Sequence, residues 1–365
     1  MKIGELCSYA PKSQIKAGEA IEGAKYMFFT SSADENKRYS DYQFDGEGII
    51  MGTGGNATLH YYSGKYSTST DCVVLLPNEK VRCKYLYYYL KANMNVLEAG
   101  FKGAGLKHTN KKYINDICID NIPDCGKQDK IIYILDKIQD IIDAKNKELK
   151  LLDDLIKARF VEMFGDPVAN EMGWNTLPLE NACKAIVDCP HSTPSYTKED
   201  TGFMCIRTSI VKKNRIIWDD IEYIPEDEFL KRIQRKKPDV GDIVYTREGA
   251  ILGIAAIIDR DCNVALGQRS MLLSPNTDKC TSEFLCVAMN RDSFLDNALK
   301  GVSGSASPHI NVGDIKAFRM IMPPIELQEQ FADFFHQVNK SKVVVQKSLN
   351  ETQMLFDSLM QKYFG

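Results

Sequence analysis

The stretch "RFVEMFGDP" (residues 159–167) lies near the middle of the chain, and the stretch "LMQKYFG" (359–365) closes it. Both contain the same Phe-Gly pair, and the two pairs lie 200 positions apart. Glycine commonly stands just past the end of a helix, and an apolar-rich segment precedes each pair. One helix ending that occurs twice in a chain of 365 residues predicts an internal duplication.

The duplication extends backwards from the Phe-Gly pairs without a gap. Identical residues recur at the 200-residue offset at five further places: Pro123 and Pro323, Gln128 and Gln328, Lys147 and Lys347, Leu149 and Leu349, and Leu155 and Leu355. Overall identity is low, but apolar positions also coincide, for example Ile131 with Phe331. The sequence therefore contains two similar elements, one in each half.

Each element has the periodicity of a long helix that packs along one seam, with apolar residues three or four positions apart. The positions that we expect to pair are Ile131, Leu135, Ile138, Ile142, Leu149 and Leu152 in the first helix and Phe331, Phe335, Val338 and Leu349 in the second. Pro123 and Pro323 mark the starts, and Gly165 marks a stop.

A helix of this length is difficult to bury alone. Roughly 38 residues at 1.5 Å each extend roughly 57 Å, more than a compact domain covers. We therefore expect the two helices to pair with each other in an antiparallel coiled coil. The alternative is two separate helices, each packed on its own domain.

The regions before each helix are rich in short β-branched and aromatic runs between Gly, Asn and Asp turns. We expect an α+β fold with pseudo-two-fold symmetry, in which two strand-rich domains alternate with the two helices. The expected divisions are a first domain at 1–123, a helix at 124–165, a linker at 166–175, a second domain at 176–323 and a helix at 324–365.

The two strand-rich regions share a weak skeleton. "GEGIIMGTGGNATLHYY" (46–62) and "GDIVYTREGAILGIAAII" (241–258) both read as strand, glycine-containing loop, strand. "LLPN" (75–78) corresponds to "LSPN" (273–276), and a His-x-Asn triplet follows in each region, beginning at His108 and at His309. Between these points the sequences diverge, so similar helices carry dissimilar domains.

Bulk composition excludes several classes of protein. A net charge of −3 argues against a protein that coats nucleic acid by charge alone. The 11 cysteines form no C-x-x-C pair, so we expect reduced, mostly buried thiols and no metal site. No apolar run is long enough to span a membrane, and "MKIGELCSYAPKS" lacks the apolar core of a signal peptide, so we expect a cytoplasmic protein.

The alternation of divergent domains with similar Phe-Gly-ending helices resembles the specificity subunit of type I restriction-modification enzymes. The resemblance extends over essentially the whole chain and is most specific in the second domain. It rests there on "DCPHSTPSY" (188–196), "CIRTSIV" (205–211), "RIQRKKPDVGDIVYTREG" (232–249) and "ALGQRSMLL" (265–273).

The resemblance implies a non-catalytic chain that binds double-stranded DNA at an asymmetric, bipartite target. It implies two modification subunits as partners, which transfer a methyl group from S-adenosylmethionine to adenine N6, while this chain holds no cofactor. The resemblance also implies ATP-dependent restriction subunits as the further partners of a complex that cleaves DNA.

Motifs for self-contained chemistry are missing from the sequence. No Asn-Pro-Pro-Tyr or Asp-Pro-Pro-Tyr motif of an adenine methylase occurs, because "MPPI" (322–325) lacks both the amide or acid and the aromatic residue. No G-x-x-x-x-G-K-[ST] motif for ATP is present. Three alternatives stay open: a hidden methylase or nuclease, a coiled-coil scaffold for proteins, and the specificity subunit of a methylation-only system.

Base readout favours Arg, Lys, Asn or Gln on loops. In the second domain the candidates are Arg207, Arg247, Gln268 and Arg269. The alternative for each is a salt bridge inside the domain, for instance to Glu248 or Asp242. The basic run Lys231, Arg232, Arg235, Lys236 and Lys237 suits phosphate contacts. Its alternative is a solvated, charged helix or turn.

The signal in the first domain is weaker. The candidates are Asn56, the polar stretch "SGKYSTST" (63–70), Lys107 and His108. His108 can equally be a structural histidine, a role that "GSASPHIN" (304–311) would share in the second domain. "YLYYYL" (85–90) suggests either base stacking or, in our preferred interpretation, an amphipathic helix with buried tyrosines.

Overall fold

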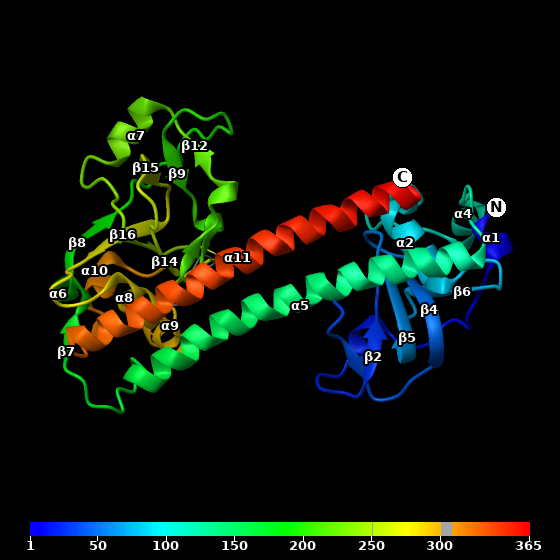
Figure 1. Cartoon of the computed structure of the whole chain (residues 1–365), viewed down its shortest axis with the longest axis horizontal. Helices are drawn as coiled ribbons and strands as arrows, with labels where there is room; N and C mark the ends of the chain where they lie inside the picture. The colour runs from blue at the N-terminus through cyan, green and yellow to red at the C-terminus, as the bar shows by residue number, and fades with distance from the viewer. Residues whose placement is uncertain (250, 301–308) are drawn as a thin grey trace. The chain divides into compact units, whose positions relative to one another are not determined.

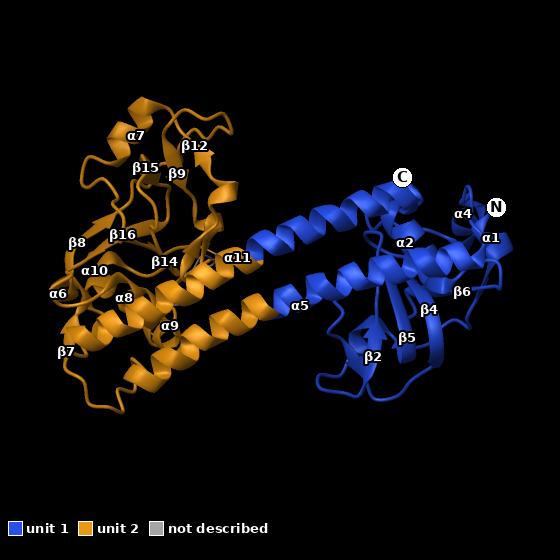
Figure 2. Cartoon of the chain, viewed as in Figure 1, with its two compact units in different colours: residues 1–147, 346–365 blue, residues 148–345 orange. Residues whose placement is uncertain are grey.

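A computed structural model describes residues 1–249, 251–300 and 309–365. The chain divides into two compact units (Figure 2). Unit 1 comprises Met1–Lys147 and Gln346–Gly365, and unit 2 comprises Glu148–Val345. Each unit therefore contains one strand-rich region together with part of both long helices.

Unit 1 is built on a six-stranded sheet in the order β1-β6-β4-β5-β2-β3, in which only β2 and β5 run parallel. Its strands are β1 (Cys7–Tyr9), β2 (Tyr26–Phe29), β3 (Arg38–Tyr39), β4 (Phe44–Gly52), β5 (Leu59–Thr68) and β6 (Cys72–Pro77). Its short helices are α1 (Ile3–Leu6), η1 (Ala17–Glu19), α2 (Cys83–Ala92), α3 (Met94–Glu98) and α4 (Lys111–Asp116).

Helix α2 packs its apolar side against the sheet and the long helices. Leu86 is fully buried in one cluster with Ile49 of β4 and Leu75 of β6. Tyr85 and Tyr88 of the same helix are also buried. The "YLYYYL" stretch is therefore an amphipathic helix with buried tyrosines.

Unit 2 divides its strands among smaller sheets, with the orders β14-β13-β16-β8, β12-β9-β15, β10-β11 and β17-β7. The strands are β7 (Thr176–Pro178), β8 (Cys183–Asp188), β9 (Met204–Ile206), β10 (Val211–Lys212), β11 (Arg215–Ile216), β12 (Glu222–Tyr223), β13 (Ile243–Thr246), β14 (Ala255–Ile257), β15 (Val264–Leu266), β16 (Ser270–Pro275) and β17 (Arg319–Ile321). The short helices are α6 (Leu179–Ala182), η2 (Thr208–Ile210), η3 (Trp218–Asp220), α7 (Glu226–Arg232), α8 (Ser282–Met289), α9 (Asp292–Leu299) and α10 (Val312–Ala317).

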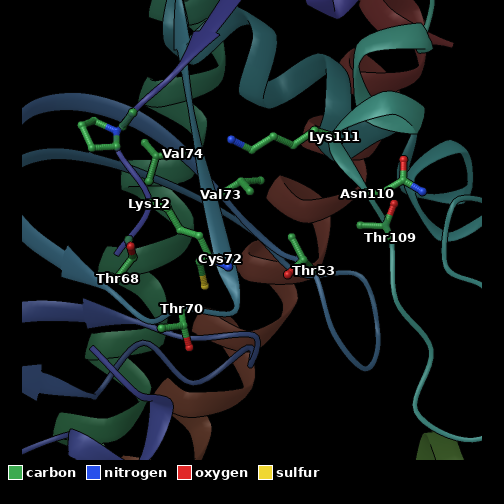
Figure 3. Close-up of a pocket in the computed structure, with 12 residues that line it drawn as sticks. Lys12, Thr53, Thr68, Thr70, Cys72, Val73, Val74, Thr109, Asn110 and Lys111 are labelled. Atoms are coloured by element: carbon green, nitrogen blue, oxygen red, sulfur yellow. The ribbon is translucent and has the colours of Figure 1, made fainter. Parts of the chain in front are cut away.

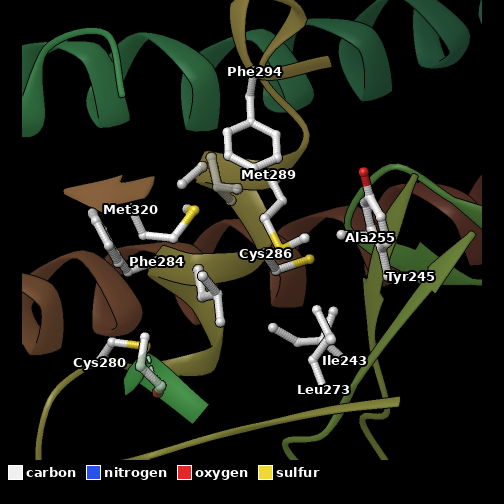
Figure 4. Packing of buried hydrophobic residues seen from close by; sticks show 14 of the residues in the cluster. Ile243, Tyr245, Ala255, Leu273, Cys280, Phe284, Cys286, Met289, Phe294 and Met320 are labelled. Atoms are coloured by element: carbon white, nitrogen blue, oxygen red, sulfur yellow. Dashed lines mark hydrogen bonds between the residues drawn. The ribbon is translucent and has the colours of Figure 1, made fainter. Parts of the chain in front are cut away.

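The core of unit 2 lies between its four-stranded sheet and α8. Figure 4 shows Phe284 and Cys286 of α8 packed among Ile243, Leu273 and Met320. All 11 cysteines of the chain are unpaired thiols. Burial raises the pKa of the Cys286 thiol, so this cysteine is a neutral, space-filling side chain.

The two units share the skeleton that the sequence indicated. The order β1-β6-β4-β5 in unit 1 is matched by β8-β16-β13-β14 in unit 2. The short helices α1 and α6, which precede β1 and β8, end in the same hydrogen bond. The Leu6 carbonyl accepts the Asn78 N–H at 2.8 Å, and the Ala182 carbonyl accepts the Asn276 N–H at 2.8 Å. These asparagines end the "LLPN" and "LSPN" stretches, so the short motifs mark one conserved turn.

The two long helices, α5 (Cys125–Phe164) and α11 (Ile325–Phe364), have 40 residues each (Figure 1). In unit 1 the start of α5 packs on the end of α11, with Leu135 and Ile138 in one cluster with Phe356. In unit 2 the reverse holds, with Phe160 packed on Phe331. The helices therefore pair in antiparallel directions within each unit, as predicted.

The burial of the seam positions varies along the helices. Leu135, Ile138, Ile142, Phe331, Phe335 and Val338 are buried, and Ile131, Leu149, Leu152 and Leu349 are half-buried. At the end of α5, however, Phe160 and Phe164 are buried more deeply than Met163, which continues the seven-residue spacing of Ile142 and Leu149. They contact Phe284 of the globular part as well as α11, so the helix ends have a wider apolar face than a simple seam.

The repeated Phe-Gly pair closes each helix in the same way. Gly165 adopts a left-handed conformation with φ of 73°, which suits a glycine after the last helical residue. The carbonyl of Phe164 accepts the Trp174 indole N–H at 2.9 Å, and that of Phe364 accepts the Asn93 side-chain amide at 3.2 Å. A side chain from the globular part therefore caps both helix ends.

The repeated glutamines fix the helix starts. The Gln128 side-chain amide donates to the carbonyls of Pro123 and Lys80, and its oxygen accepts the backbone N–H of Arg82 at 2.7 Å. The Gln328 amide likewise donates to the carbonyls of Pro323 and Lys279, and its oxygen accepts the N–H of Thr281 at 3.1 Å. Both glutamines are fully buried, and each ties a long helix to the start of α2 or α8.

Candidate nucleic-acid interface

Arg247 follows β13 and is buried, with 5% of its surface exposed. Its guanidinium donates to both carboxylate oxygens of Asp188, at 3.0 and 3.3 Å, and pairs with Glu248 at 2.9 Å. His191 lies 3.4 Å from the same guanidinium. This geometry favours the salt bridge inside the domain, with Glu248 as expected and with Asp188 in place of Asp242.

Arg232 ends α7 and serves the interior of the domain. Its guanidinium donates to Glu228 at 2.8 Å, to the Leu266 carbonyl at 3.2 Å and to the Ser192 carbonyl at 2.7 Å. Only 1% of its side chain is exposed. The arginine is therefore neither free for a phosphate nor part of a solvated charged face, because it joins three segments of unit 2.

Arg207 precedes η2 and is one-third exposed. It pairs with Glu222 at 3.2 Å, and its guanidinium carbon lies 5.5 Å from the centre of the Tyr196 ring. These contacts hold the side chain beside β12 and leave part of the guanidinium open to solvent. Arg207 therefore forms a salt bridge inside the domain, and base readout by its exposed part stays a prediction.

The remaining basic residues after α7 differ in availability. Lys231 is exposed and pairs with Asp227, one turn earlier on the helix. Arg235 and Lys237 are exposed, whereas Lys236 is held by Asp239 at 2.8 Å and by the buried Asp242 at 2.7 Å.

Partial burial acts to lower the pKa of Lys236, but its hydrogen bonds to Asp239 and Asp242 outweigh that effect and raise the pKa. Lys236 is consequently a cation with two partners of its own, while Lys237 donates a hydrogen bond to the side-chain oxygen of Asn263. The basic run divides into buried, paired and open side chains.

Gln268 and Arg269 lie in the turn that leads into β16. Arg269 is exposed and adopts a left-handed backbone conformation with φ of 69°. Such a conformation costs a non-glycine residue about 1 to 3 kcal/mol, and such strain clusters at functional sites. Gln268 is half-buried and accepts a hydrogen bond from Thr193 at 2.9 Å. The turn holds the backbone at Arg269 in place and leaves its side chain in solvent.

In unit 1, two loops are joined by backbone hydrogen bonds. The Gly55 N–H donates to the Lys107 carbonyl at 2.9 Å, and the Thr109 N–H donates to the Thr53 carbonyl at 3.0 Å. Asn56, Lys107 and His108 are all exposed on these loops. The loops thus form one polar surface at the end of β4.

Unit 2 repeats this junction. His108 forms a backbone bridge with Gly54, and His309 forms one with Glu248, which occupies the matching loop. Both histidines mark a structural junction, and the exposed ring of His108 leaves its DNA contact a prediction. Residues 304–308 of "GSASPHIN" lie outside the described residues.

A cavity of about 200 Å³ lies beside this polar surface in unit 1 (Figure 3). Its lining comes from the segment after β1, the end of β4, the turn between β5 and β6, and the start of α4. Lys12 and Lys111 are its charged residues, and no acidic residue lines it.

One basic element of unit 2 escaped the sequence patterns. The β10–β11 hairpin places Lys212 and Arg215 in exposed positions, with Lys213 and Asn214 at its tip. Asn214 is anchored by the Asn290 side-chain amide at 2.7 Å. Two-residue strands give almost no periodic signal, so only the Lys-Lys-Asn-Arg turn at 212–215 could have indicated the hairpin.

Among the residues that the structure describes, no group of three or more His, Cys, Asp or Glu side chains is arranged to hold a metal ion. Across the same residues, no helix combines the length and the apolar character that crossing a membrane requires.

Comparisons with known proteins give one consistent result. Residues 1–153 and 173–352 match the family model of the type I restriction modification DNA specificity domain. The chain is 23% identical over 331 residues to the specificity subunit of the type I restriction enzyme MjaVIII from Methanocaldococcus jannaschii, over 86% of this chain and 76% of that protein. It is 20% identical over 405 residues to the EcoDI specificity subunit from Escherichia coli, over 99% and 85% of the two chains.

The crystal structure of the S subunit of a type I restriction-modification system from M. genitalium has the same fold. Its TM-score is 0.63 at 14% sequence identity, over 100% of this chain and 95% of that one. The family model includes both strand-rich regions and most of both long helices. The chain therefore belongs to the type I restriction-modification specificity family, as a non-catalytic subunit that recognises DNA targets.

Proposed function

We propose that this chain directs adenine N6 methylation to an asymmetric, bipartite DNA target, with one half-site read by the strand-rich region of each unit. In this family the specificity subunit carries no cofactor, and S-adenosylmethionine is bound by the partner modification subunit. In this proposal the chain selects the DNA site, and its partners carry out the methyl transfer.

The observation that carries the proposal is a shared core with different outer loops. The strand order β1-β6-β4-β5 recurs as β8-β16-β13-β14, and Gln128 and Gln328 fix both regions to the helices alike. The loops at the ends of these strands carry different side chains: unit 1 presents Asn56 and Lys107, whereas unit 2 presents Gln268 and Arg269. Equivalent frames with different donors and acceptors are suited to reading different bases.

Exposure divides the candidate contacts with DNA. Arg269, Gln268, Arg207, Asn56, Lys107 and His108 are at least partly open and are proposed for base readout or loop contacts. Lys231, Arg235 and Lys237 are open and are proposed for phosphate contacts, which position a protein without specifying sequence. Arg232 and Arg247 are proposed as supports of the loops, because their guanidinium groups are already occupied.

Apolar residues exposed on the long helices support two modification subunits as partners. Unit 1 exposes Tyr133, Ile134, Ile141, Met354 and Leu355, and unit 2 exposes Leu151, Leu155, Val161, Val343 and Val344. We propose these exposed side chains as the contact points, because large exposed apolar surfaces mark interaction sites in soluble proteins. One such set on the helix segments of each unit matches one partner for each unit.

The remaining features of the proposal rest on the sequence. The target-recognition domains are placed at 1–123 and 176–323, with the linker at 166–175. The complex is placed in the cytoplasm, where the host DNA lies. ATP-dependent restriction subunits are the further partners when the complex also cleaves DNA, and a methylation-only system is the alternative.

Mapping N6-methyladenine across the host genome, with and without this gene, tests the proposal. We expect one bipartite motif, with different half-sites on the two sides of a spacer, to lose its methylation when the gene is removed. A second strain that carries only the Arg269→Ala variant should keep the spacer and one half-site. An unchanged set of methylated motifs after gene deletion would refute the function.

A further inference from the structure

We propose that the cavity beside β6 in unit 1 is a phosphate-binding site that anchors the DNA backbone next to the loops of Asn56 and Lys107. This inference rests on the proposed function, since a phosphodiester of target DNA is the intended ligand. It adds Lys12 and Lys111 to the contacts, neither of which the sequence patterns selected.

The charge of the lining indicates an anion. Lys12 comes from the segment after β1, and Lys111 comes from the first turn of α4, so residues far apart in sequence meet at one cavity. The lining contains no aspartate or glutamate, and among the described residues neither lysine has a carboxylate partner. Two ammonium groups beside several hydroxyls suit the oxygens of a phosphate.

The orientation of Lys111 is fixed by its neighbours. Its ammonium lies 4.4 Å from the centre of the Tyr9 ring. Tyr9 is held in turn, because its hydroxyl donates to Asn115 at 2.8 Å. Figure 3 shows the Lys111 side chain extending from α4 toward Val74 of β6. A lysine directed across the cavity by an aromatic ring is a placed charge rather than a freely moving one.

The walls between the lysines combine small polar residues with apolar ones, among them Val73 and Val74 of β6. Thr53, Thr70 and Cys72 line the inner part of the cavity. The Thr53 hydroxyl donates to the Asp71 carbonyl at 2.9 Å and thereby fixes the turn between β5 and β6. The Thr53 side chain therefore ties the segment after β4 to this turn at the wall of the cavity.

The equivalent place in unit 2 is filled. The backbone N–H of Thr53 donates to Asp71, and that of Arg247 donates to Arg269, so Thr53 and Arg247 occupy matching positions. Thr109 and Ile310 donate to the carbonyls of these two residues, at 3.0 and 2.9 Å. In unit 2 the Arg247 guanidinium, paired with Asp188 and Glu248, occupies this position. In unit 1 the smaller Thr53 side chain lines an open cavity there, in which an external group can bind.

The position of the cavity favours DNA as the source of the phosphate. Thr53 and Thr109 line it, and they begin and end the loops that present Asn56 and His108. A phosphate held there would lie beside the bases that these loops reach. Phosphate contacts of this kind set the register of a protein on the duplex.

The test uses the full chain assembled with its modification subunits, on the target defined by methylation mapping. Each phosphate of the half-site is replaced in turn by a neutral methylphosphonate, and the dissociation constant is measured. In the wild type, one replacement next to the unit 1 half-site should weaken binding roughly tenfold, the usual size of a lost charge-assisted contact. In the Lys12→Gln/Lys111→Gln variant, the same replacement should have no further effect.

The matched control removes the same charge elsewhere in unit 1. Lys25 and Lys80 are exposed, and they lie at the opposite ends of β2 and β6 from the cavity. The Lys25→Gln/Lys80→Gln variant should keep the full effect of the methylphosphonate. The Lys12→Arg/Lys111→Arg variant should also keep most of it, which shows that charge at the cavity, and not the fold, is responsible.

The outcomes separate the sources of failure. A complex that binds its mapped target but shows no methylphosphonate coupled to Lys12 and Lys111 overturns the phosphate site and leaves the proposed function intact. A complex without any target preference overturns the proposed function itself. Inorganic phosphate is titrated into the chain by calorimetry as a separate arm. Binding that depends on both lysines without any coupling on DNA would assign the cavity to a free anion and overturn the DNA source.

Discussion

Units 1 and 2 share one strand order in their cores but present different surfaces. In unit 1, β4 and β5 are long strands of 9 and 10 residues inside one six-stranded sheet. In unit 2 the matching strands β13 and β14 have 4 and 3 residues, and a separate sheet holds β9, β12 and β15. The parts that contact the long helices are alike, and the parts far from them differ.

The comparison shows where the fold tolerates change. The helix-proximal residues must fill a core and satisfy buried backbone groups, so Gln128 and Gln328 make the same three contacts. The distal loops meet solvent and carry no such constraint. Thr53 and Arg247 illustrate this freedom, because one leaves a cavity and the other fills the same place with an ion-pair cluster.

The largest effect is expected from changing one helix without the other. Seven residues inserted into α5 after Lys145 alone should shift the seam against α11 and abolish target recognition. The same insertion in both helices, after Lys145 and after Val345, keeps the register. If the helix pair sets the spacing of the half-sites, it should lengthen the spacer by roughly 10 Å, or about three base pairs. Methylation mapping gives the motif, and an unchanged spacer with full activity would show that the helix pair does not set the spacing of the half-sites.

The next largest effect compares the two closing phenylalanines. Phe164→Ala and Phe364→Ala should each lower the free energy of unfolding of their own unit by about 3 to 5 kcal/mol. Phe164 should cost more, because it is fully buried against Phe284 and Phe331, whereas Phe364 keeps 6% of its surface exposed. Denaturant unfolding, followed by hydrogen exchange in each unit, measures both. A loss spread equally over the two units after either change would show that the units do not unfold separately.

The repeated glutamines give a smaller, symmetric prediction. Gln128→Ala and Gln328→Ala each remove three hydrogen bonds and leave the backbone N–H of Arg82 or Thr281 without its acceptor. We expect a loss of roughly 1 to 3 kcal/mol for each, measured by thermal unfolding. The exposed Gln353→Ala on α11 is the control and should change stability little. A large effect at only one of the two glutamines would break the equivalence of the units.

Arg247 and Arg269 separate support from readout. Arg247→Ala should lower stability, because it leaves Asp188 and Glu248 without their partner. Arg269→Ala should leave the thermal midpoint nearly unchanged but cost roughly 1 to 3 kcal/mol of selectivity in one half-site only. Binding to targets with single base changes measures the second effect. A stable Arg247→Ala protein with a relaxed motif would restore Arg247 as a base-reading residue.

The smallest effect concerns the two adjacent lysines of unit 2. Lys237→Gln should weaken binding to all sequences alike and reduce the slope of log K against log salt by about 0.9. Lys236→Gln should barely change this slope, because Lys236 is already paired with Asp239 and Asp242, and should instead reduce stability slightly. Equal slopes for the two variants would show that the ion pairs of Lys236 open on DNA.

The positions and lengths of the two long helices could be predicted from the sequence. The contacts that individual side chains make could not. Pro123, Gln128 and the Phe-Gly pair have counterparts 200 positions later. The prolines and glutamines make the same contacts in both units, whereas the carbonyls of the closing phenylalanines accept from different side chains, Trp174 and Asn93. Periodicity records which face is apolar, so it located Leu135 and Phe331 in the seam. It missed the depth of Phe160, because the globular part widens the apolar face there.

The sequence by itself determined the duplication, the helix pair and the membership of the family, since these depend on spacing along the chain. Only the tertiary structure decided which basic residues are free. Arg232 and Arg247 look like Arg235 and Arg269 in sequence, yet contacts with residues 34 to 59 positions away bury the first two. Lys12 and Lys111 likewise meet at one cavity only because the sheet brings β1 and α4 together, and no local pattern encodes such long-range neighbours.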